Sequence, residues 1–192
     1  MPCHITVLRF FKRIKMGNRF RKLLAQGKPI IFDGGFGTTL FDHGVFINRC
    51  FDHINITDPD LVKKVHREFV KAGAMVIETN TFGANRYKLA SFDLADKLRD
   101  INQAGARLAK EAAGDEVLVA GSVGPLGIHL EPLFGDNNAD DARKAFIEQI
   151  EVLVDGGVDL ILLETFTEVE EMKLGLEAAT MVREKFGLDL PV

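Results

Sequence analysis

Polar side chains that could bind a charged ligand follow short apolar runs at several places in the sequence. They are Asp33, Glu78, Asn80, Thr81, Ser122 and Glu164. A carboxylate in such a position could hold a ligand's ammonium group through a charge-assisted hydrogen bond. The glycines that follow Asp33 would let the backbone approach the same ligand closely. These residue types therefore indicate a site for a molecule that carries an amino group.

Each of the two most prominent carboxylates also has an ordinary structural explanation. Asp33 could form the turn that opens a Gly-rich loop, and Glu164 could cap a helix or be a buried structural carboxylate. Either residue alone is a weak signal. Their placement at the same end of one predicted sheet favours binding.

Other chemical signatures are missing from the sequence. Gly35-Phe36-Gly37 lacks the third glycine of a dinucleotide-binding motif, and no Gly-Lys-Ser or Gly-Lys-Thr is present for a phosphate-binding loop. Cys3, Cys50 and the five histidines show no metal-ligand spacing. No Ser, Cys or His stands in a recognisable nucleophilic arrangement. His66 falls in an amphipathic helical stretch and is expected to be solvated or partly packed.

The elements that must position these residues repeat from residue 29 onward as an apolar run, a Gly- or Thr-rich turn and a helix. The four runs are Pro29–Phe32, Ala74–Ile77, Val117–Ala120 and Leu160–Leu163. Continuous apolar runs, without alternation, indicate parallel strands covered by helices, an α/β fold. In a (β/α) barrel the residues after the strands form the active site. Leu190–Val192 is expected to begin a fifth strand.

The helices between these runs carry recognisable start and stop signals. Asp58 and Pro59 predict a helix that ends at Gly73, and further helices are expected over 94–113 and from about Asp140 to 155. Thr167 and Glu170 have the spacing of a capping box for the last helix. Its expected apolar stripe is Met172, Leu176, Ala179, Val182 and Phe186.

An internal repeat relates two of the units. Residues 72–82 align without gaps on residues 156–166, with identities at Gly73/Gly157, Ile77/Ile161, Thr81/Thr165 and Phe82/Phe166. The match is too short to establish a duplication. It predicts equivalent backbone geometry at the two strands.

Charge divides the chain into a basic leader, residues 1–28, and an acidic domain, residues 29–192. The leader holds eight of the 24 basic residues and no acidic one, which leaves the domain with a net charge of −12. The leader could be an artefactual or poorly ordered extension, an ordinary solvated helix or a targeting segment. An acidic domain argues against nucleic acid as a partner, and no apolar run is long enough to span a membrane. The composition predicts a cytoplasmic protein.

Four motifs, taken together and in order, carry a family resemblance. They are Asp33–Thr38, Glu78–Asn85, Gly121–Pro125 and Leu163–Phe166. With them, residues 29–192 resemble the homocysteine S-methyltransferase family, which includes the homocysteine-binding module of cobalamin-dependent methionine synthase. Arg49–Ile56 is most similar to members fused to a methylenetetrahydrofolate reductase domain. Phe36 replaces the methionine common in the first motif.

The resemblance implies a (β/α)₈ TIM barrel that transfers a methyl group to the homocysteine sulfur, which a zinc ion holds as a thiolate. It places Asp33 and Glu164 near the homocysteine amino group. Gly34, Gly35 and Thr81 would lie near the carboxylate or backbone of homocysteine, and Asn80 would support the rim of the site.

The sequence departs from the family pattern at the zinc ligands. Family members supply one cysteine after the sixth strand and two after the eighth, whereas this sequence ends as the fifth begins, and Cys50 is not assigned to the metal. The chain is thus expected to be the first half, about four βα units, of a truncated barrel, and inactive by itself. Expected partners are the rest of the barrel, a methyl donor and a reductase or cobalamin module, with methylcobalamin or folate as the methyl source. The alternative is a non-catalytic half-barrel that self-associates or binds a partner.

Overall fold

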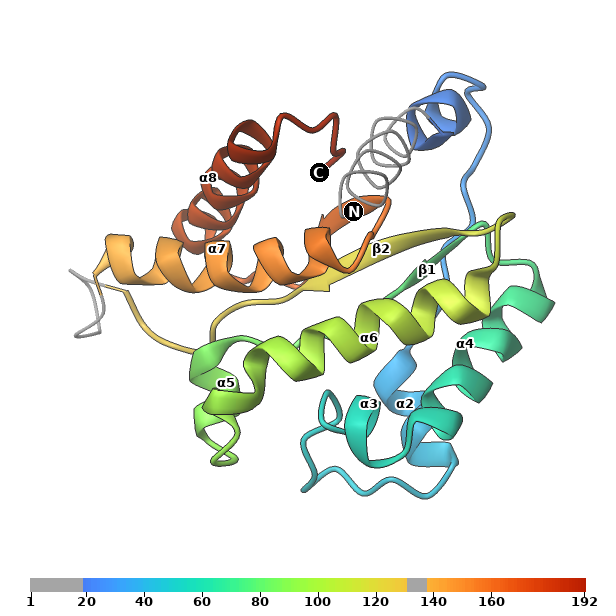
Figure 1. The fold of residues 1–192 in the computed structure, drawn as a ribbon, viewed down its shortest axis with the longest axis horizontal. Helices are drawn as coiled ribbons and strands as arrows, with labels where there is room; N and C mark the ends of the chain where they lie inside the picture. The colour runs from blue at the N-terminus through green and yellow to red at the C-terminus, as the bar shows by residue number, and fades with distance from the viewer. Residues whose placement is uncertain (1–18, 131–137) are drawn as a thin grey trace, which may run out of the picture.

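The strands and helices are arranged as one parallel sheet covered by helices (Figure 1). The structure is a computed structural model that describes residues 19–130 and 138–192. Strands β1 (Val76–Glu78), β2 (Leu118–Val123) and β3 (Leu160–Leu163) pair in parallel in the order β1-β2-β3. The helices are α2 (Phe36–Asp42), α3 (Ile54–Thr57), α4 (Pro59–Ala72), α5 (Arg86–Ala90), the 3₁₀ helix η1 (Ala95–Lys97), α6 (Leu98–Ala113), α7 (Ala139–Asp155) and α8 (Val169–Phe186). The predicted α/β class with a parallel sheet is confirmed.

The first predicted strand is much shorter than expected. Of residues 29–32, only Phe32 forms a β-bridge, to Val76. The carbonyl of Ile31 accepts from Met75 N and Val76 N at 2.8 and 3.2 Å. Pro29 has no N–H to extend the pairing backward. The segment therefore lies beside β1 without forming a full strand.

The predicted start and stop of α4 are confirmed. The Asp58 side chain accepts a hydrogen bond from Leu61 N, and Pro59 occupies the first turn. Gly73 follows the helix with φ 103°, a left-handed conformation that glycine adopts without steric cost. The helices expected over 94–113 and from Asp140 to 155 are also present, the first with a 3₁₀ turn at its start.

The predicted start and stripe of α8 are partly wrong. The helix begins after Glu168, which makes no side-chain capping bond, and Glu170 pairs with Lys173 at 2.7 Å instead of closing a capping box with Thr167. Met172 and Leu176 are 42% and 48% exposed. The buried side is Glu171, Leu174, Gly175, Ala178, Ala179 and Val182. Small residues on this buried side let α8 approach the sheet. The buried face of α8 is therefore rotated away from the predicted stripe.

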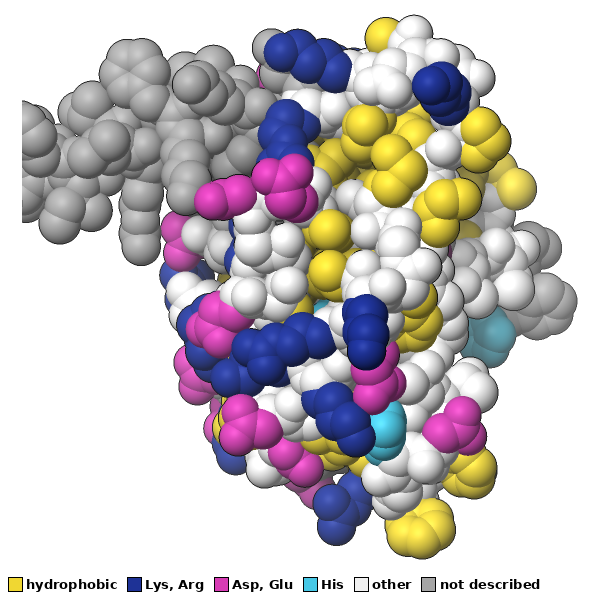
Figure 2. Space-filling view, turned by 90° about the vertical axis from the view of Figure 1, so that its right-hand side faces the viewer, with side chains coloured by type: hydrophobic (Ala, Val, Ile, Leu, Met, Phe, Trp, Pro, Cys, Tyr) yellow, Lys and Arg dark blue, Asp and Glu magenta, His cyan; other side chains and the backbone are white. Residues whose placement is uncertain are grey.

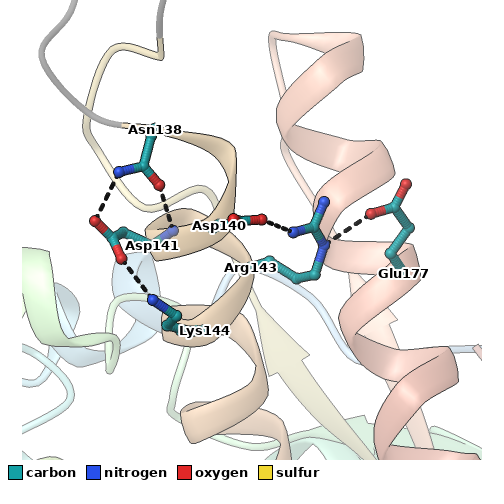
Figure 3. A network of polar contacts seen from close by, with 6 residues as sticks. All are labelled: Asn138, Asp140, Asp141, Arg143, Lys144 and Glu177. Carbon is teal, nitrogen blue, oxygen red and sulfur yellow. Dashed lines mark hydrogen bonds and ion pairs between the residues drawn. The ribbon is translucent and has the colours of Figure 1, made fainter.

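Polar contacts fix the beginning of α7 and join it to α8 (Figure 3). The Asn138 side chain caps α7 by accepting from Asp141 N at 2.9 Å. Arg143 donates to Asp140 in the same helix at 2.6 Å and to Glu177 of α8 at 2.9 Å. Such exposed pairs contribute little to stability individually, so the buried contacts between these helices carry the packing.

Apolar side chains fill both faces of the sheet. One core lies between the sheet and helices α6, α7 and α8 and contains Ile77, Val119, Phe146 and Ile161. The other face carries a second cluster, Val76, Leu118, Ala120 and Leu160, against which Phe20 and Leu23 pack. Because alternate strand residues face opposite sides, the strands carry apolar residues on both faces, and polar residues appear only toward their carboxyl ends.

Residues 19–24 are helical and contact the acidic domain. Arg21 forms an ion pair with Asp189 at 2.8 Å, and Arg19 donates to the carbonyl of Glu116 at 2.8 Å. Four further basic residues of the predicted leader, Arg9, Lys12, Arg13 and Lys15, lie outside the described residues. The division at residue 28 stays a prediction.

Hydrophobic and charged side chains gather in different parts of one face of the molecule. Figure 2 shows hydrophobic side chains gathered in the upper half of one face, with charged side chains crowded below and to the left. Among the described residues, no helix is both long enough and apolar enough to cross a membrane.

His66 lies in the interior, contrary to the expectation of a solvated or partly packed side chain. It is fully buried on α4, and neither ring nitrogen has a hydrogen-bond partner. Its ring lies 4.6 Å from that of Phe36, centroid to centroid. Burial lowers the pKa of His66 to about 3, because the charged imidazolium would lose its hydration.

The buried His66 is expected to make the fold acid-sensitive. Between its ordinary pKa of 6.5 and about 3, the unfolded state binds a proton that the folded state does not. The free energy of unfolding should therefore fall with decreasing pH across this window, by up to about 1.4 kcal/mol per pH unit from this group. Urea unfolding of wild type and His66→Leu at pH 7 and pH 4.5 checks it. Equal acid losses in both proteins would contradict the assignment.

Candidate functional site

A cavity of about 570 Å³ opens where the carboxyl ends of the strands meet the loop after Phe32. Its wall includes Gly34, Gly35, Glu78, Asn80, Ser122 and Glu164. Glu78 ends β1, Ser122 lies near the end of β2, and Glu164 follows β3. Parallel strands bring these positions to one edge of the sheet, as the sequence predicted.

Three carboxyl groups lie near one another beside this cavity: Glu78 and Glu164 line it, whereas Asp33 is not among the lining residues and contacts the backbone of Glu78. The Asp33 carboxylate accepts from Glu78 N at 2.9 Å through Oδ2, while its Oδ1 is buried without a partner. Glu78 and Glu164 both belong to the cavity wall. Ser122 Oγ also donates a hydrogen bond to Glu164 Oε1. We call Asp33, Glu78 and Glu164 the acidic cluster.

The acidic cluster has unusual proton affinities. Burial, together with the negative charge of Glu164, raises the pKa of Asp33 to about 6, although its backbone hydrogen bonds oppose the change. Burial also raises the pKa of Glu78 to about 8, and the charges of Glu164 and Asp33 add to this effect. Such a cluster disfavours accumulating negative charge, and a cationic group placed among the carboxyls would relieve the repulsion.

Thr81 lies behind the wall of the cavity. Its side chain is fully buried, and its hydroxyl donates to the carbonyl of Ser122 at 2.8 Å. Thr79 Oγ1 lies 2.6 Å from Thr81 Oγ1 and accepts from Ser122 N at 3.0 Å. The two threonines thus join the ends of β1 and β2. A direct contact of Thr81 with ligand stays a prediction.

Asn80 lines the cavity and holds the loop before α3. Its Nδ2 donates to the carbonyl of Phe51 at 2.8 Å and to Asn55 Oδ1 at 3.0 Å. Asn55 Nδ2 in turn donates to the carbonyl of Asn80 at 2.7 Å. The role of Asn80 as support for the rim stays a prediction. Asn55 was not singled out from the sequence.

A second wall of the cavity was also missed by sequence reasoning. Asp52 is buried; it accepts from Gly83 N at 2.9 Å and from the thiol of Cys50 at 3.8 Å. A Cβ atom on Gly83 would lie 2.7 Å from Asp52 Oδ2, so the close approach requires glycine. Lys88 Nζ lies 4.4 Å from the centroid of the Phe82 ring. Burial lowers the pKa of Lys88, whereas the charge of Asp52 opposes this.

The backbone after Glu164 is strained. Thr165 lines the cavity with φ 59°, in the left-handed region that β-branched residues rarely adopt. Such a conformation costs on the order of 1–3 kcal/mol and is typical of functional sites. It turns the chain sharply at the point where Glu164 enters the acidic cluster.

The described residues do not fit a zinc ion. Within residues 19–130 and 138–192, no three His, Cys, Asp or Glu side chains are grouped as metal ligands. Cys50 is one of the residues that line the cavity. Burial and the charge of Asp52 raise the pKa of its thiol to about 11. A zinc ligand must be a thiolate, which this environment disfavours. No chemical step through a metal follows from these residues.

Comparison with known proteins relates the chain to a family. Residues 30–192 match the family model described as homocysteine S-methyltransferase. The chain is 34% identical to a methionine synthase of Mycobacterium leprae and 34% identical to one of Mycobacterium tuberculosis, over 88% and 86% of its length. These alignments cover only 15% of either methionine synthase.

Two crystal structures share the fold. The metallated form of the homocysteine methyltransferase MmuM from Escherichia coli is 23% identical, with a TM-score of 0.70 over 83% of this chain. The oxidized form is 24% identical, with a TM-score of 0.72 over 84%. The chain spans 62% and 61% of those structures. The expected relation to part of a TIM-barrel fold is thereby confirmed.

Proposed function

The chain belongs to the homocysteine S-methyltransferase family, and from that premise we propose that its cavity binds homocysteine for transfer of a methyl group to the sulfur. The acidic cluster would hold the ammonium group, with Asp33 and Glu164 as the contacting carboxylates. Gly34 and Gly35, on the cavity wall, would lie near the carboxylate or backbone of homocysteine. Thr81 would position this end of β1, and Asn80 would keep the rim in place.

One observation supports the amino-group assignment above the others. Asp33 Oδ1 is buried in the acidic cluster and has no partner. A buried polar oxygen without a hydrogen bond is costly, and an ammonium group has three donors with which to satisfy it. The same positive charge would offset the repulsion between the three carboxyls.

The sulfur-activating group and the methyl source belong to the same proposal. The family resemblance suggests zinc as the group that holds the thiolate. The ligands of that zinc would have to come from residues other than those described. The similarity to methionine synthases supports methylcobalamin or folate as the methyl source. Further barrel residues and a cobalamin or reductase module would be its partners, and the cytoplasm its location.

The proposal predicts that the ligand's amino group dominates binding. L-Homocysteine and its des-amino analogue, 4-sulfanylbutanoate, are titrated calorimetrically into the chain under reducing conditions at pH 7. We expect the analogue to bind at least tenfold more weakly, because it leaves the acidic cluster without a cation. Equal binding of both ligands, or binding of neither, would contradict the proposal. The self-associating half-barrel stays an alternative prediction.

A further inference from the structure

Three buried amide side chains hold the loop of residues 79–85, which follows β1 and contributes to the cavity wall. Each amide nitrogen donates to a different backbone carbonyl of this loop at 2.7 Å: Asn55 of α3 to Asn80, Asn102 of α6 to Ala84, and Gln149 of α7 to Thr81. None of the three side chains belongs to a residue more than 1% exposed. We call Asn55, Asn102 and Gln149 the amide brace. It joins three helices to one loop of the site.

The far ends of two of these amides are unsatisfied. The side-chain oxygens of Asn102 and Gln149 are buried and have no hydrogen-bond partner within the described part of the chain. A buried oxygen without a donor costs free energy. The Thr81 carbonyl also accepts from Ala84 N at 3.0 Å, so an apolar side chain at position 149 would leave fewer unsatisfied groups than Gln149 does. The amide therefore serves the placement of the loop at the expense of stability.

Helix α6 approaches the same loop so closely that a larger side chain does not fit. A Cβ atom on Gly105 would lie 2.6 Å from Thr81 Cγ2 and 2.8 Å from Asn55 Nδ2. Phe82 and Gly83 of the loop line the cavity, whereas no member of the amide brace does. The loop thus lies between the helices and the cavity, and the brace can affect a ligand only through the loop.

We propose that the members of the amide brace are positioning residues, which fix the loop of residues 79–85 in its binding conformation before the ligand arrives. The identity of that ligand, homocysteine, rests on the proposed function. A loop that is already ordered loses less conformational entropy when a ligand binds, so the affinity is higher. Side chains held in place by buried hydrogen bonds also keep the contacting groups of a site in register. The acidic cluster contributes charge, and the brace contributes the fixed shape of the neighbouring wall.

Gln149→Met separates positioning from a purely structural role. Methionine has a similar length, cannot donate to the Thr81 carbonyl and carries no unsatisfied oxygen. We expect the affinity for L-homocysteine to fall about tenfold, while the urea midpoint of unfolding stays close to that of wild type. Gln103→Met is the matched control and should change neither, because Gln103 Nε2 contacts Asp155 Oδ2 at 3.4 Å and not the loop. A lower midpoint with unchanged affinity would mean that Gln149 is structural only, and the inference would be wrong.

Amide hydrogen exchange of the ligand-free chain, followed by NMR, tests the brace independently of homocysteine. Gly83 N reports on the loop, because it donates to Asp52 and contacts no member of the brace. Gln149→Met and Asn102→Leu should each raise its exchange rate about tenfold, and leave that of Val119 N in β2 unchanged.

The two measurements fail in different ways. Equal exchange rates of Gly83 N in wild type and both variants would overturn the inference whether or not homocysteine binds. If the rates rise as expected but wild type does not bind homocysteine, the brace is supported and the proposed function is wrong.

Discussion

Glu164→Gln is expected to weaken homocysteine binding by tens- to thousands-fold. Glu164 follows β3, accepts from Ser122 Oγ and faces the cavity beside Asp33 and Glu78. Removing one partner of a desolvated charge pair costs roughly 2–5 kcal/mol, much of it because the other charge is left unpaired. At about 1.4 kcal/mol per decade of affinity, this corresponds to the stated range. Calorimetric titration of L-homocysteine into both proteins measures it.

A structural role for Glu164 makes the opposite prediction. The glutamine carbonyl can still accept from Ser122, so the variant should unfold close to the wild-type temperature. If Glu164 mainly stabilises the fold, the variant should lose thermal stability while its folded fraction keeps its affinity. Glu170→Gln is the matched control, because Glu170 is exposed and pairs only with Lys173 within the described chain. Unchanged affinity in Glu164→Gln would remove this residue from the site.

Phe146→Ala should cost about 3–5 kcal/mol in the free energy of unfolding. The Phe146 side chain is fully buried in the core between the sheet and helices α6, α7 and α8. Its ring lies 5.9 Å from that of Phe166, two residues beyond Glu164. Truncation removes apolar contacts and leaves a cavity that the rigid surroundings fill only in part. Urea unfolding at pH 7 gives the loss directly.

A second phenylalanine provides the control for that loss. Phe46 is 67% exposed, so Phe46→Ala should change the free energy of unfolding by no more than about 0.5 kcal/mol. A similar loss in both variants would mean that the described core does not carry the stability. A loss confined to Phe146→Ala would support the packing of α7 and α8 on the sheet.

The helices were predictable where local signals agree with packing. Asp58 and Pro59 mark the start of α4, and Gly73 its end, because capping and backbone restrictions act within a few residues. The internal repeat is useful for the same reason: Gly73 and Gly157, which it equates, both have positive φ. At α8 the local signals failed, because the approach of Gly175 to Leu163 decides which side is buried.

Half of the candidate site was predictable because strand ends meet in a parallel sheet. Asp33, Glu78 and Glu164 could be grouped from their positions alone. Asp52 and Asn55 could not, because they contact Gly83 and Asn80, 31 and 25 residues further along, and no local pattern encodes such pairs. His66 was misplaced similarly, since an imidazole on an amphipathic helix gives no sign of which neighbours will cover it.

The register of the sheet has a consequence for how the chain folds as it is synthesised. Val76 pairs with Leu118 and Ala120 with Leu160, so each strand meets its next partner only after some 40 residues. At about 5–20 residues per second, β1 waits roughly 2–8 seconds for β2 to be made. Closing such long loops is slow compared with helix formation. Until then β1 contacts only Phe32 and α4 among the elements already made. The backbone N–H and C=O groups on its other edge stay unpaired, and its apolar side chains are open to chaperones.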